Sequence, residues 1–592
     1  MFKLFCTFMF FLLLTSKVHS DPPTIRQTTN GPIEGIEETG VFGKKFYAFK
    51  GVPYAEVPIT GIDPYTGATV DRRFKPTSIL TRKWTEPLKV HQFGENCIAS
   101  SYLMGQDGGY SENCLFLNIY VPAGGVDEKT VLVWIHGGSF LEGSGREVAY
   151  GPDFLVDLDN IVITMNYRLG IFGFMNLGFG DYTGNMGLKD QQLALKWIFQ
   201  NIENFGGNKD EILLFGESAG GASVSYHMLN EKSRKYFQRA MSLSSTALNY
   251  YSLYEPNHLE RVQNCTNIQD KNKLIEYLRK GDAGTIAECG QMMKMEPIRF
   301  ESPWVPTIEN PKTRGAFITK SPEEIYKSEK APIMDTLFTF NSQEYLLFNL
   351  DLTRKFNPIL DGNWNESLFL LAFRGLDKET YPEVYRYSFD LLKRSYLKDV
   401  TNNKAIMRGN INLLSDMNFV YPILKTVQYQ VIANNKYKAK NTFIFRFNVT
   451  GSMNVFKNSM VLDAEGASHA DEICYIFRCH IMNSVYKKKL RSKSTSNIEY
   501  KTIKRLTKMI TNFARTGDPS IDGDTFKSSK SPNKLFCLDI GGNESKLHAD
   551  IMEQTRFYQW KKIEDFYKNF RSNDSLTEFT KNFKMNSIWK NP

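Results

Sequence analysis

Long hydrophobic runs are missing from this sequence of 592 residues once its amino terminus is passed. No later segment approaches the roughly 18 uninterrupted apolar residues that indicate a membrane-spanning helix. Internal repeats, low-complexity tracts and linkers rich in proline or serine are also missing, so we expect residues 21–592 to form a single domain. The formal net charge of +9 and the 42% share of hydrophobic residues are those of an ordinary soluble globular protein.

Clustered positive charge is scarce as well. Basic residues are scattered apart from the run Lys487–Lys489 and Arg491. One short cluster makes no extended basic surface, and we interpret it as a solvated loop rather than a nucleic-acid site. The sequence therefore favours partners other than nucleic acids.

The one hydrophobic run, at the amino terminus, is too short to cross a membrane. Lys3 precedes an apolar core of 11 residues, Leu4–Leu14, and small residues follow around Ser20. This pattern predicts a signal peptide over residues 1–20. The carboxyl-terminal tail shows neither a hydrophobic anchor nor a retention signal, so we expect a secreted, extracellular protein.

Cysteine is rare, with eight residues, of which Cys6 would leave with the signal peptide. Cys97 and Cys114 bracket a short polar, glycine-rich loop and are expected to form a disulfide in an oxidising compartment. Cys265 and Cys289 are a second, weaker pairing. We interpret Cys474, which lies in an apolar run, as a buried small residue. Seven is an odd number, so at least one thiol is expected to remain free or to pair outside the chain.

Five glycosylation sequons fit a secreted protein. They lie at Asn264, Asn365, Asn448, Asn543 and Asn573.

Short apolar runs alternate with helical patterns in the central third of the chain. Residues 131–135, 161–165 and 212–215 are typical of buried strands, and Lys189–Asn201 carries apolar residues at helical spacing. Further strands are predicted at 336–340 and 442–447. Strands separated by helices indicate an α/β fold with a mostly parallel sheet. The helical, loop-rich region from Tyr345 to Val427 is expected to cover the carboxyl edge of that sheet as a cap.

Ser218 lies in the most informative segment, Phe215–Gly221. A strand, the pattern Gly-x-Ser-x-Gly and a helix follow one another here, which is the context of a nucleophile elbow. Glycines are needed because the turn is too sharp for side chains beside the serine. Ser218 is therefore a candidate nucleophile at the carboxyl end of its strand.

Histidine is also scarce, with eight residues, and this helps to select the base that a serine nucleophile requires. His227 lies nine residues along the helix that follows Ser218, about 13 Å away along the axis, and cannot fold back. His136 precedes a glycine turn and has a different role. His469 lies in a turn of small residues beyond a predicted strand, where we expect a mobile, exposed base. His480 is the alternative, but it follows an apolar run.

An acidic residue should orient that base, and it should fall between the serine and the histidine in the chain. Glu344 follows the strand predicted at 336–340 through a polar loop and is the favoured candidate. Asp361 and Asp416 are alternatives.

Backbone donors for an oxyanion are expected from the glycine turn after the strand 131–135. His136 and the glycine turn of Gly137, Gly138 and Ser139 follow this strand, so backbone N–H groups of the turn would point into the site. The N–H group of Ala219 would complete the set. Losing one such donor typically raises a barrier by about 2.7–4 kcal/mol.

Over nearly all of its length the chain resembles the type-B carboxylesterase and cholinesterase family. Besides the elbow, the segments that carry the resemblance are Phe49–Ala55, Arg73–Phe74, Ser111–Tyr120, Asn166–Arg168, Gly187–Gln191, Phe205–Asn208 and Asn512–Pro519. The resemblance implies an α/β-hydrolase fold with helical cap insertions and no cofactor or metal ion. It places a triad on Ser218, Glu344 and His469, an oxyanion hole on Gly138, Ser139 and Ala219, and a disulfide on Cys97–Cys114.

Four departures from the family pattern bear on function. Ser139 stands where many relatives have glycine, Tyr345 follows the acid where glycine is common, and Tyr277 stands where relatives often have the partner of the second disulfide. Tryptophan is absent between Cys97 and Cys114, where cholinesterases use one to bind a quaternary ammonium. This absence argues against acetylcholine as the substrate.

The function implied by the resemblance is that of a secreted serine carboxylesterase acting on a small-molecule ester. A non-catalytic adhesion or binding protein of the same family is the alternative from another class, but all three triad positions are filled here. A lipase or a juvenile-hormone-type esterase would differ in the shape of its pocket.

Overall fold

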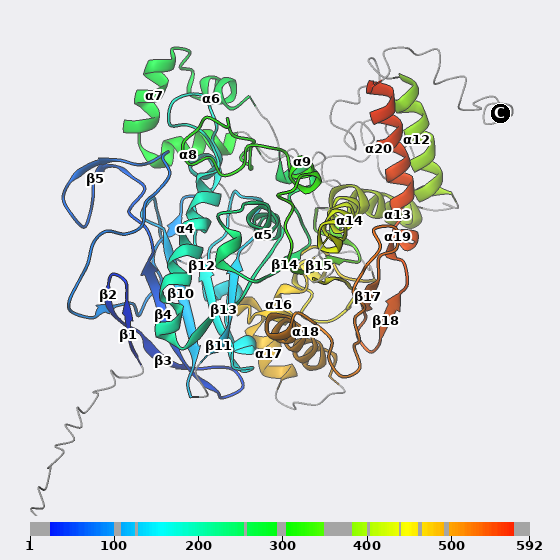
Figure 1. The fold of residues 1–592 in the computed structure, drawn as a ribbon, viewed down its shortest axis with the longest axis horizontal. Helices are drawn as coiled ribbons and strands as arrows, with labels where there is room; N and C mark the ends of the chain where they lie inside the picture. The colour runs from blue at the N-terminus through cyan, green and yellow to red at the C-terminus, as the bar shows by residue number, and fades with distance from the viewer. Residues whose placement is uncertain are drawn as a thin grey trace, which may run out of the picture.

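A mixed β-sheet runs through the centre of the computed structural model (Figure 1). The structure describes residues 24–99, 108–124, 128–253, 257–292, 303–348, 382–398, 403–436, 440–459, 465–490 and 497–572. The expected signal peptide lies outside these residues. Among them the sheet has 11 strands. In spatial order they are β18 (Ser545–His548), β17 (Cys537–Ile540), β16 (Thr442–Phe447), β15 (Asp335–Asn341), β14 (Arg239–Leu243), β13 (Gly207–Glu217), β11 (Lys129–Ile135), β12 (Ile161–Met165), β10 (Phe116–Pro122), β4 (Lys45–Pro53) and β3 (Ile36–Thr39).

All strand pairs from β17 through β12 are parallel, and both edges of the sheet are antiparallel. Every residue of β11 and β12 is buried. Val131, Val133 and Ile135 pack into the core on one face of the sheet, and Leu132 and Trp134 into the core on the other. Burial on both faces explains why these strands are continuous apolar runs rather than alternating ones.

Smaller strands and helices surround the sheet. The strands outside it are β1 (Ile25–Thr28), β2 (Gly31–Glu34), β5 (Thr60–Ile62), β6 (Thr69–Asp71), β7 (Leu88–Lys89), β8 (Asn96–Cys97) and β9 (Tyr110–Ser111). The helices are α1 (Glu147–Tyr150), α2 (Asp153–Val156), α3 (Gly170–Phe174), α4 (Met186–Asn201), α5 (Ala219–Leu229), α6 (His258–Thr266), α7 (Lys271–Lys280), α8 (Ala283–Met292), α9 (Pro322–Lys327), α12 (Pro382–Leu397), α13 (Asn403–Ser415), α14 (Tyr421–Asn435), α15 (Val455–Ser459), α16 (Ile473–Ile476), α17 (Asn483–Lys489), α18 (Ile498–Thr516), α19 (Ile551–Gln554) and α20 (Phe557–Ser572). Among the helices of the described residues, none combines the length and hydrophobicity that crossing a bilayer requires.

Helix α18 shows how local sequence sets the ends of an element. The side chain of Asn497 accepts hydrogen bonds from the N–H groups of Glu499 and Tyr500, so it caps the first turn. Gly517 ends the helix in the left-handed conformation, with φ of 80°, which glycine adopts without steric cost. The apolar face between these caps packs into the core that also holds Leu132 and Trp134.

The α/β-hydrolase architecture is confirmed, with differences at element ends. The strands predicted at 161–165 and 442–447 have those bounds in the structure. Helix α4 begins three residues before the predicted start, after Asn185 in the left-handed conformation. The basic run Lys487–Lys489 forms the last turn of α17 rather than a loop, although Lys487 and Lys488 are exposed as expected.

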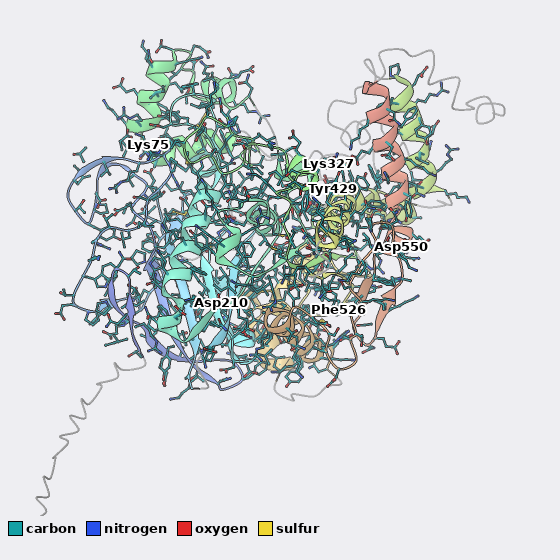
Figure 2. The ribbon with its side chains drawn as sticks, in the orientation of Figure 1. Lys75, Asp210, Lys327, Tyr429, Phe526 and Asp550 are labelled. Atoms are coloured by element: carbon teal, nitrogen blue, oxygen red, sulfur yellow. A yellow bond between two sulfur atoms is a disulfide. The ribbon has the colours of Figure 1, made fainter. Side chains whose placement is uncertain are left out.

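The described part of the cap is helical. Helices α12, α13 and α14 belong to it, and α13 continues into α14 through a π-helical turn, Asp416–Val420. Figure 1 shows α12 beside α20, the last helix, although the two are far apart in the sequence. In Figure 2, Tyr429 of α14 lies close to α9, where its ring stacks on that of Tyr326 at a centroid distance of 5.6 Å.

Candidate active site

Ser218 lies directly after β13, at the sharp turn into α5. Its φ of 55° and ψ of −124° place it in a conformation that non-glycine residues rarely adopt. A Cβ atom on Gly220 would lie 2.0 Å from the carbonyl oxygen of Ile135, and one on Gly216 would lie 2.6 Å from the same oxygen. Glycine is thus required on both sides of Ser218 because the turn is pressed against strand β11.

The structure brings Ser218, His469 and Glu344 into one chain of hydrogen bonds. Nε2 of His469 lies 2.9 Å from Oγ of Ser218, and Nδ1 lies 2.7 Å from Oε2 of Glu344. Oε1 of Glu344 accepts a hydrogen bond of 2.6 Å from the N–H group of Asn341. The geometry is that of a nucleophile, a base and an orienting acid.

The loops after β15 and β16 hold the acid and the base together. These two strands are parallel neighbours, so their carboxyl ends meet at one edge of the sheet. The N–H group of Gln343 donates to the carbonyl of Ala467, and that of His469 donates to the carbonyl of Glu344. The side chain of Asn341 also donates to the carbonyl of Ser468, at 2.7 Å.

The competing acidic residues lie elsewhere. Asp416 is buried in the cap and binds Arg556 at 2.6 Å and the hydroxyl of Tyr396 at 2.6 Å. It therefore anchors the cap to the segment before α20. Asp361 lies outside the described residues.

The competing histidines have other surroundings. His480 is exposed on a short 3-10 turn. His227 is buried between Ser233 and Gln191, which lie within hydrogen-bond distance of its two ring nitrogens. His136 stacks on Tyr167 at a centroid distance of 4.5 Å. Burial lowers the pKa of His136 to about 4 and that of His227 to about 3, so both rings are neutral at physiological pH.

His469 is buried, with 3% of its surface exposed, which corrects the expectation of an exposed base. The rings of Phe419 and Phe348 lie 4.7 and 5.7 Å from its imidazole, centroid to centroid. These aromatic rings exclude water from one side of the base. Sequence reasoning missed them because both come from segments of the cap.

Two further carboxyl groups act on the base. Oε1 of Glu217 lies 3.1 Å from Nε2 of His469, and Glu472 accepts a hydrogen bond of 2.6 Å from Asn341. Burial alone would lower the pKa of His469, but the carboxylates of Glu217 and Glu344 raise it to about 9. Burial raises the pKa of Glu217 and of Glu472. The imidazolium form of His469 is therefore strongly stabilised.

The glycine turn after β11 lies against the nucleophile. A Cβ atom on Gly137 would lie 3.0 Å from Cβ of Ser218, so only glycine fits here without displacing its neighbours. Gly138 has φ of 104°, and the next two residues, Ser139 and Phe140, have φ of 55° and 62°. Ser139 therefore holds a left-handed conformation that favours glycine. Gly138 and Ser139 both line the cleft that contains Ser218.

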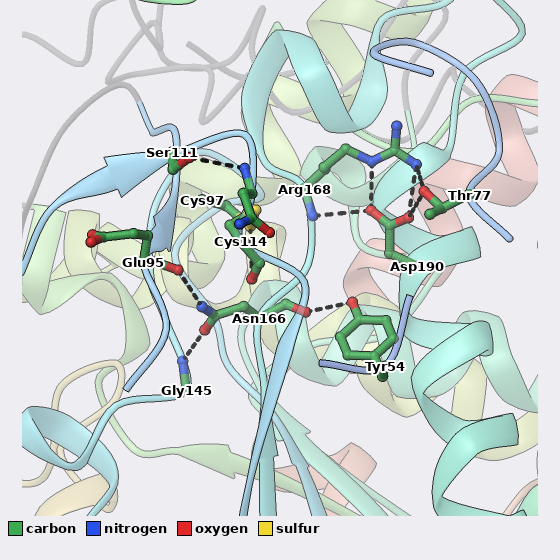
Figure 3. Close-up of a disulfide and its surroundings, with 11 residues drawn as sticks. Tyr54, Thr77, Glu95, Cys97, Ser111, Cys114, Gly145, Asn166, Arg168 and Asp190 are labelled. Atoms are coloured by element: carbon green, nitrogen blue, oxygen red, sulfur yellow. Dashed lines mark hydrogen bonds and ion pairs between the residues drawn. A yellow bond between two sulfur atoms is a disulfide. The ribbon is translucent and has the colours of Figure 1, made fainter. Parts of the chain in front are cut away.

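The loop after β12 is held by hydrogen bonds and an ion pair, which Figure 3 shows. Oδ1 of Asn166 accepts a hydrogen bond of 2.8 Å from the N–H group of Gly145, and its backbone carbonyl accepts one from the hydroxyl of Tyr54. Arg168, in the same loop, makes a bidentate ion pair with Asp190, both contacts being 2.7 Å. Buried bidentate pairs of this kind fix geometry strongly.

The cleft beside Ser218 has a free volume of about 80 Å³ and opens to solvent at its mouth. Leu347, Phe348, Phe456 and Ile473 form an apolar wall. Glu142, Tyr150 and Glu217 are polar residues that also line the cleft.

Three disulfides occur among the described residues. Cys97–Cys114 and Cys265–Cys289 are the two expected pairs. The third, Cys474–Cys479, corrects the interpretation of Cys474 as an unpaired buried residue. The two sulfurs meet because the chain turns after α16, where Arg478 pairs with the backbone of Gly151. Cys537 is free and buried, in line with the odd number of cysteines.

Three of the five sequons fall on described residues. Asn264 on α6 and Asn543 between β17 and β18 are exposed, whereas Asn448 is half-buried. Asn365 and Asn573 lie outside the described residues, as do residues 100–107 of the loop between Cys97 and Cys114.

Comparison with known proteins identifies the family of the chain. Residues 22–560 match the model of the carboxylesterase family. The chain is 27% identical to Esterase B1 of Culex pipiens, over 90% of this chain and 97% of that protein. It is 30% identical to the juvenile hormone esterase of Tribolium castaneum, over 76% of this chain and 78% of that protein.

A solved structure is similar over almost the whole chain. It is the juvenile hormone esterase of Manduca sexta with OTFP covalently attached, with a TM-score of 0.76 and 25% identity, covering 92% of this chain and 99% of that one. The fold and the carboxyl-edge site define an α/β hydrolase. The chain belongs to the carboxylesterase family.

Proposed function

We propose that this chain is a secreted serine carboxylesterase that hydrolyses small carboxylic esters through an acyl-enzyme intermediate. The single observation that carries the proposal is the run of hydrogen bonds from Ser218 Oγ through His469 to Glu344, at 2.9 and 2.7 Å, opening on a cleft. Esterase relatives support hydrolysis of carboxylic esters as the reaction class. In one solved relative a ligand, OTFP, is covalently attached.

In the first half-reaction Oγ of Ser218 attacks the ester carbonyl carbon and its proton passes to Nε2 of His469. The N–H groups of Gly138, Ser139 and Ala219 stabilise the negative charge that develops on the carbonyl oxygen. The bond to the alkoxy oxygen then breaks, and His469 donates its proton to the departing alcohol. An acyl group remains on Ser218.

In the second half-reaction water attacks the acyl carbon. His469 takes a proton from this water and returns it to Oγ of Ser218 as the acyl bond breaks, which releases the acid. Glu344 holds Nδ1 of the imidazole throughout and stabilises the imidazolium.

The apolar wall of Leu347, Phe348, Phe456 and Ile473 supports apolar acyl or alcohol groups in the substrate. A juvenile-hormone-type ester or a lipid ester would use the same chemistry. The hydrogen bonds of His469 to both Ser218 and Glu344 argue against the alternative of a non-catalytic binding protein.

Substitution of the nucleophile and the base tests the proposal. We expect Ser218→Ala and His469→Ala each to reduce kcat/KM for p-nitrophenyl butyrate by at least about 10³-fold, with no further loss in the double variant, because the two residues act as a unit. A Ser218→Ala protein with activity within a few-fold of the original would refute the serine mechanism.

A further inference from the structure

A buried carboxylate lies two residues after the base. Asp471 is 1% exposed, and each of its two oxygens accepts two hydrogen bonds. Its side chain is not among the described residues that line the cleft. An effect of Asp471 on the reaction would therefore pass through the groups that it holds.

On one side, Asp471 fixes the turn that carries the base. Its Oδ2 accepts a hydrogen bond of 2.7 Å from the N–H group of Ser468, and its own N–H group donates to the carbonyl of Ser468 at 3.2 Å. His469 and Ala470 are the two residues between them. Ala470 has φ of 64°, a left-handed conformation that alanine rarely adopts. The turn therefore needs contacts that hold it, and the carboxylate supplies one of them.

On the other side, Asp471 holds a wall of the cleft. Its Oδ1 accepts hydrogen bonds from the N–H groups of Phe456 and Lys457, at 3.0 and 3.2 Å. Both belong to the first turn of α15, where N–H groups have no partner within their own helix. Phe456 lines the cleft. One carboxylate thus joins this wall to the turn of the base.

Asn454 keeps the carboxylate directed at these donors. Its Nδ2 donates to Oδ2 of Asp471 at 3.2 Å and to the carbonyl of Val449 at 2.8 Å. Its Oδ1 accepts a hydrogen bond of 2.9 Å from the hydroxyl of Tyr475. Asn454 is fully buried, so the carboxylate of Asp471 is held by a buried network rather than by solvent.

We propose that Asp471 is a positioning residue for ester hydrolysis, whose carboxylate fixes the turn of His469 and the wall residue Phe456 relative to each other. This inference rests on the proposed esterase function. Nε2 of His469 must stay within hydrogen-bond distance of Ser218 while the substrate lies along the wall. A displacement of about 1 Å in such a site can reduce the rate about 100-fold.

Asp471→Asn tests the inference, because it keeps the shape of the side chain and removes acceptors. An amide has one acceptor oxygen, and its NH₂ group would face N–H donors on one of the two sides. The readout is kcat for p-nitrophenyl butyrate on the plateau at high pH, so a shift in the pKa of His469 does not enter. In the native protein Asp471 is ionised there, because burial raises its pKa only to about 6.

The value of kcat is expressed per active site, and the sites are counted by covalent reaction with an organophosphate ester. We expect Asp471→Asn to reduce kcat per site at least about tenfold. A contact that serves stability alone would instead lower the melting temperature and the number of sites, and would leave kcat per site unchanged. If Asp471→Asn does not fold, Asp471→Ala removes the acceptors without placing an NH₂ group against the N–H donors.

Asp63→Asn is the matched control. Asp63 is also 1% exposed, and its Oδ1 accepts hydrogen bonds from the N–H groups of Tyr65 and Thr66. It follows β5, in a loop that contributes no residue to the described lining of the cleft. This variant should lower the melting temperature and leave kcat per site unchanged.

The outcomes separate this inference from the proposed function. A kcat per site within about twofold of the native value, in a folded variant at position 471, overturns the positioning role. An equal fall in Asp63→Asn overturns it as well. If the native protein does not hydrolyse the ester, or if Ser218→Ala hydrolyses it at the native rate, the proposed function fails instead.

Discussion

Substitution of Glu217 by glutamine should change the pH dependence of ester hydrolysis in a specific way. Oε1 of Glu217 lies 3.1 Å from Nε2 of His469, and the neighbouring carboxylates raise the pKa of that imidazole to about 9. At this distance Coulomb's law gives about 1.3 kcal/mol even in the dielectric of water, which corresponds to about one pH unit. Glutamine carries no charge, so the pKa of His469 should fall by at least about one unit.

The sign of the effect on activity follows from the role of the base. His469 must be neutral to accept the proton of Ser218, so kcat/KM rises with pH as the imidazolium loses its proton. In the Glu217→Gln variant this rise should occur at a pH at least about one unit lower. The transition state also contains an imidazolium, and it loses the same stabilisation. The plateau at high pH should therefore fall by about tenfold, whereas the branch at low pH should hardly change.

The assay is kcat/KM for a neutral ester between pH 5 and pH 10, corrected for spontaneous hydrolysis. Glu211→Gln, on the same strand but away from the site, serves as the control and should reproduce the native profile. A Glu217→Gln profile with an unmoved rise and an unchanged plateau would show that this carboxylate does not interact with the base.

Three further predictions concern the acid, the glycine turn and the unexpected disulfide. Glu344→Gln should reduce kcat/KM at least about 10³-fold because glutamine favours the wrong tautomer of the imidazole, whereas Asp416→Asn should lower the melting temperature and leave kcat/KM unchanged. If steady-state kinetics show the reverse pattern, the orienting acid is Asp416. Ser139→Gly should raise the free energy of unfolding by about 1 kcal/mol, measured by denaturant titration, because the left-handed φ of 55° strains a serine; a lower stability would contradict that cause. Replacing Cys474 and Cys479 by serine should lower the free energy of unfolding by about 2 kcal/mol, which is the chain-entropy cost of the short loop that the disulfide closes. Non-reducing peptide mapping that finds both thiols free in the native protein would contradict this prediction.

The sheet could be predicted from the sequence because parallel strands that are buried on both faces consist of continuous apolar runs. Val162 and Ile163 point to opposite cores, yet both must be apolar, and the pattern 161–165 therefore marks the strand with its correct ends. Ser218 was recognisable because its turn needs glycine on both sides, for a reason that the contact with Ile135 makes explicit.

Contacts between distant segments could not be predicted in this way. Phe419 covers His469 only because a π-helical turn of the cap lies over the loop after β16. Cys474 sits in an apolar run like any core residue, and its partner is brought to it by a turn pinned to Gly151. Glu142 carries a weak signal, an acidic residue inside a glycine-rich turn, but its position on the wall of the cleft depends on the fold of that turn.

Covalent labelling tests the central claim, that Ser218 is the nucleophile, most directly. The purified protein would be treated with an organophosphate ester, digested and mapped by mass spectrometry, with Ser218→Ala treated in parallel. We predict one stoichiometric adduct on Ser218, formed as activity is lost, and none in the variant. An adduct on another residue that tracks the loss of activity, or full inactivation with Ser218 unmodified, would contradict the proposed mechanism.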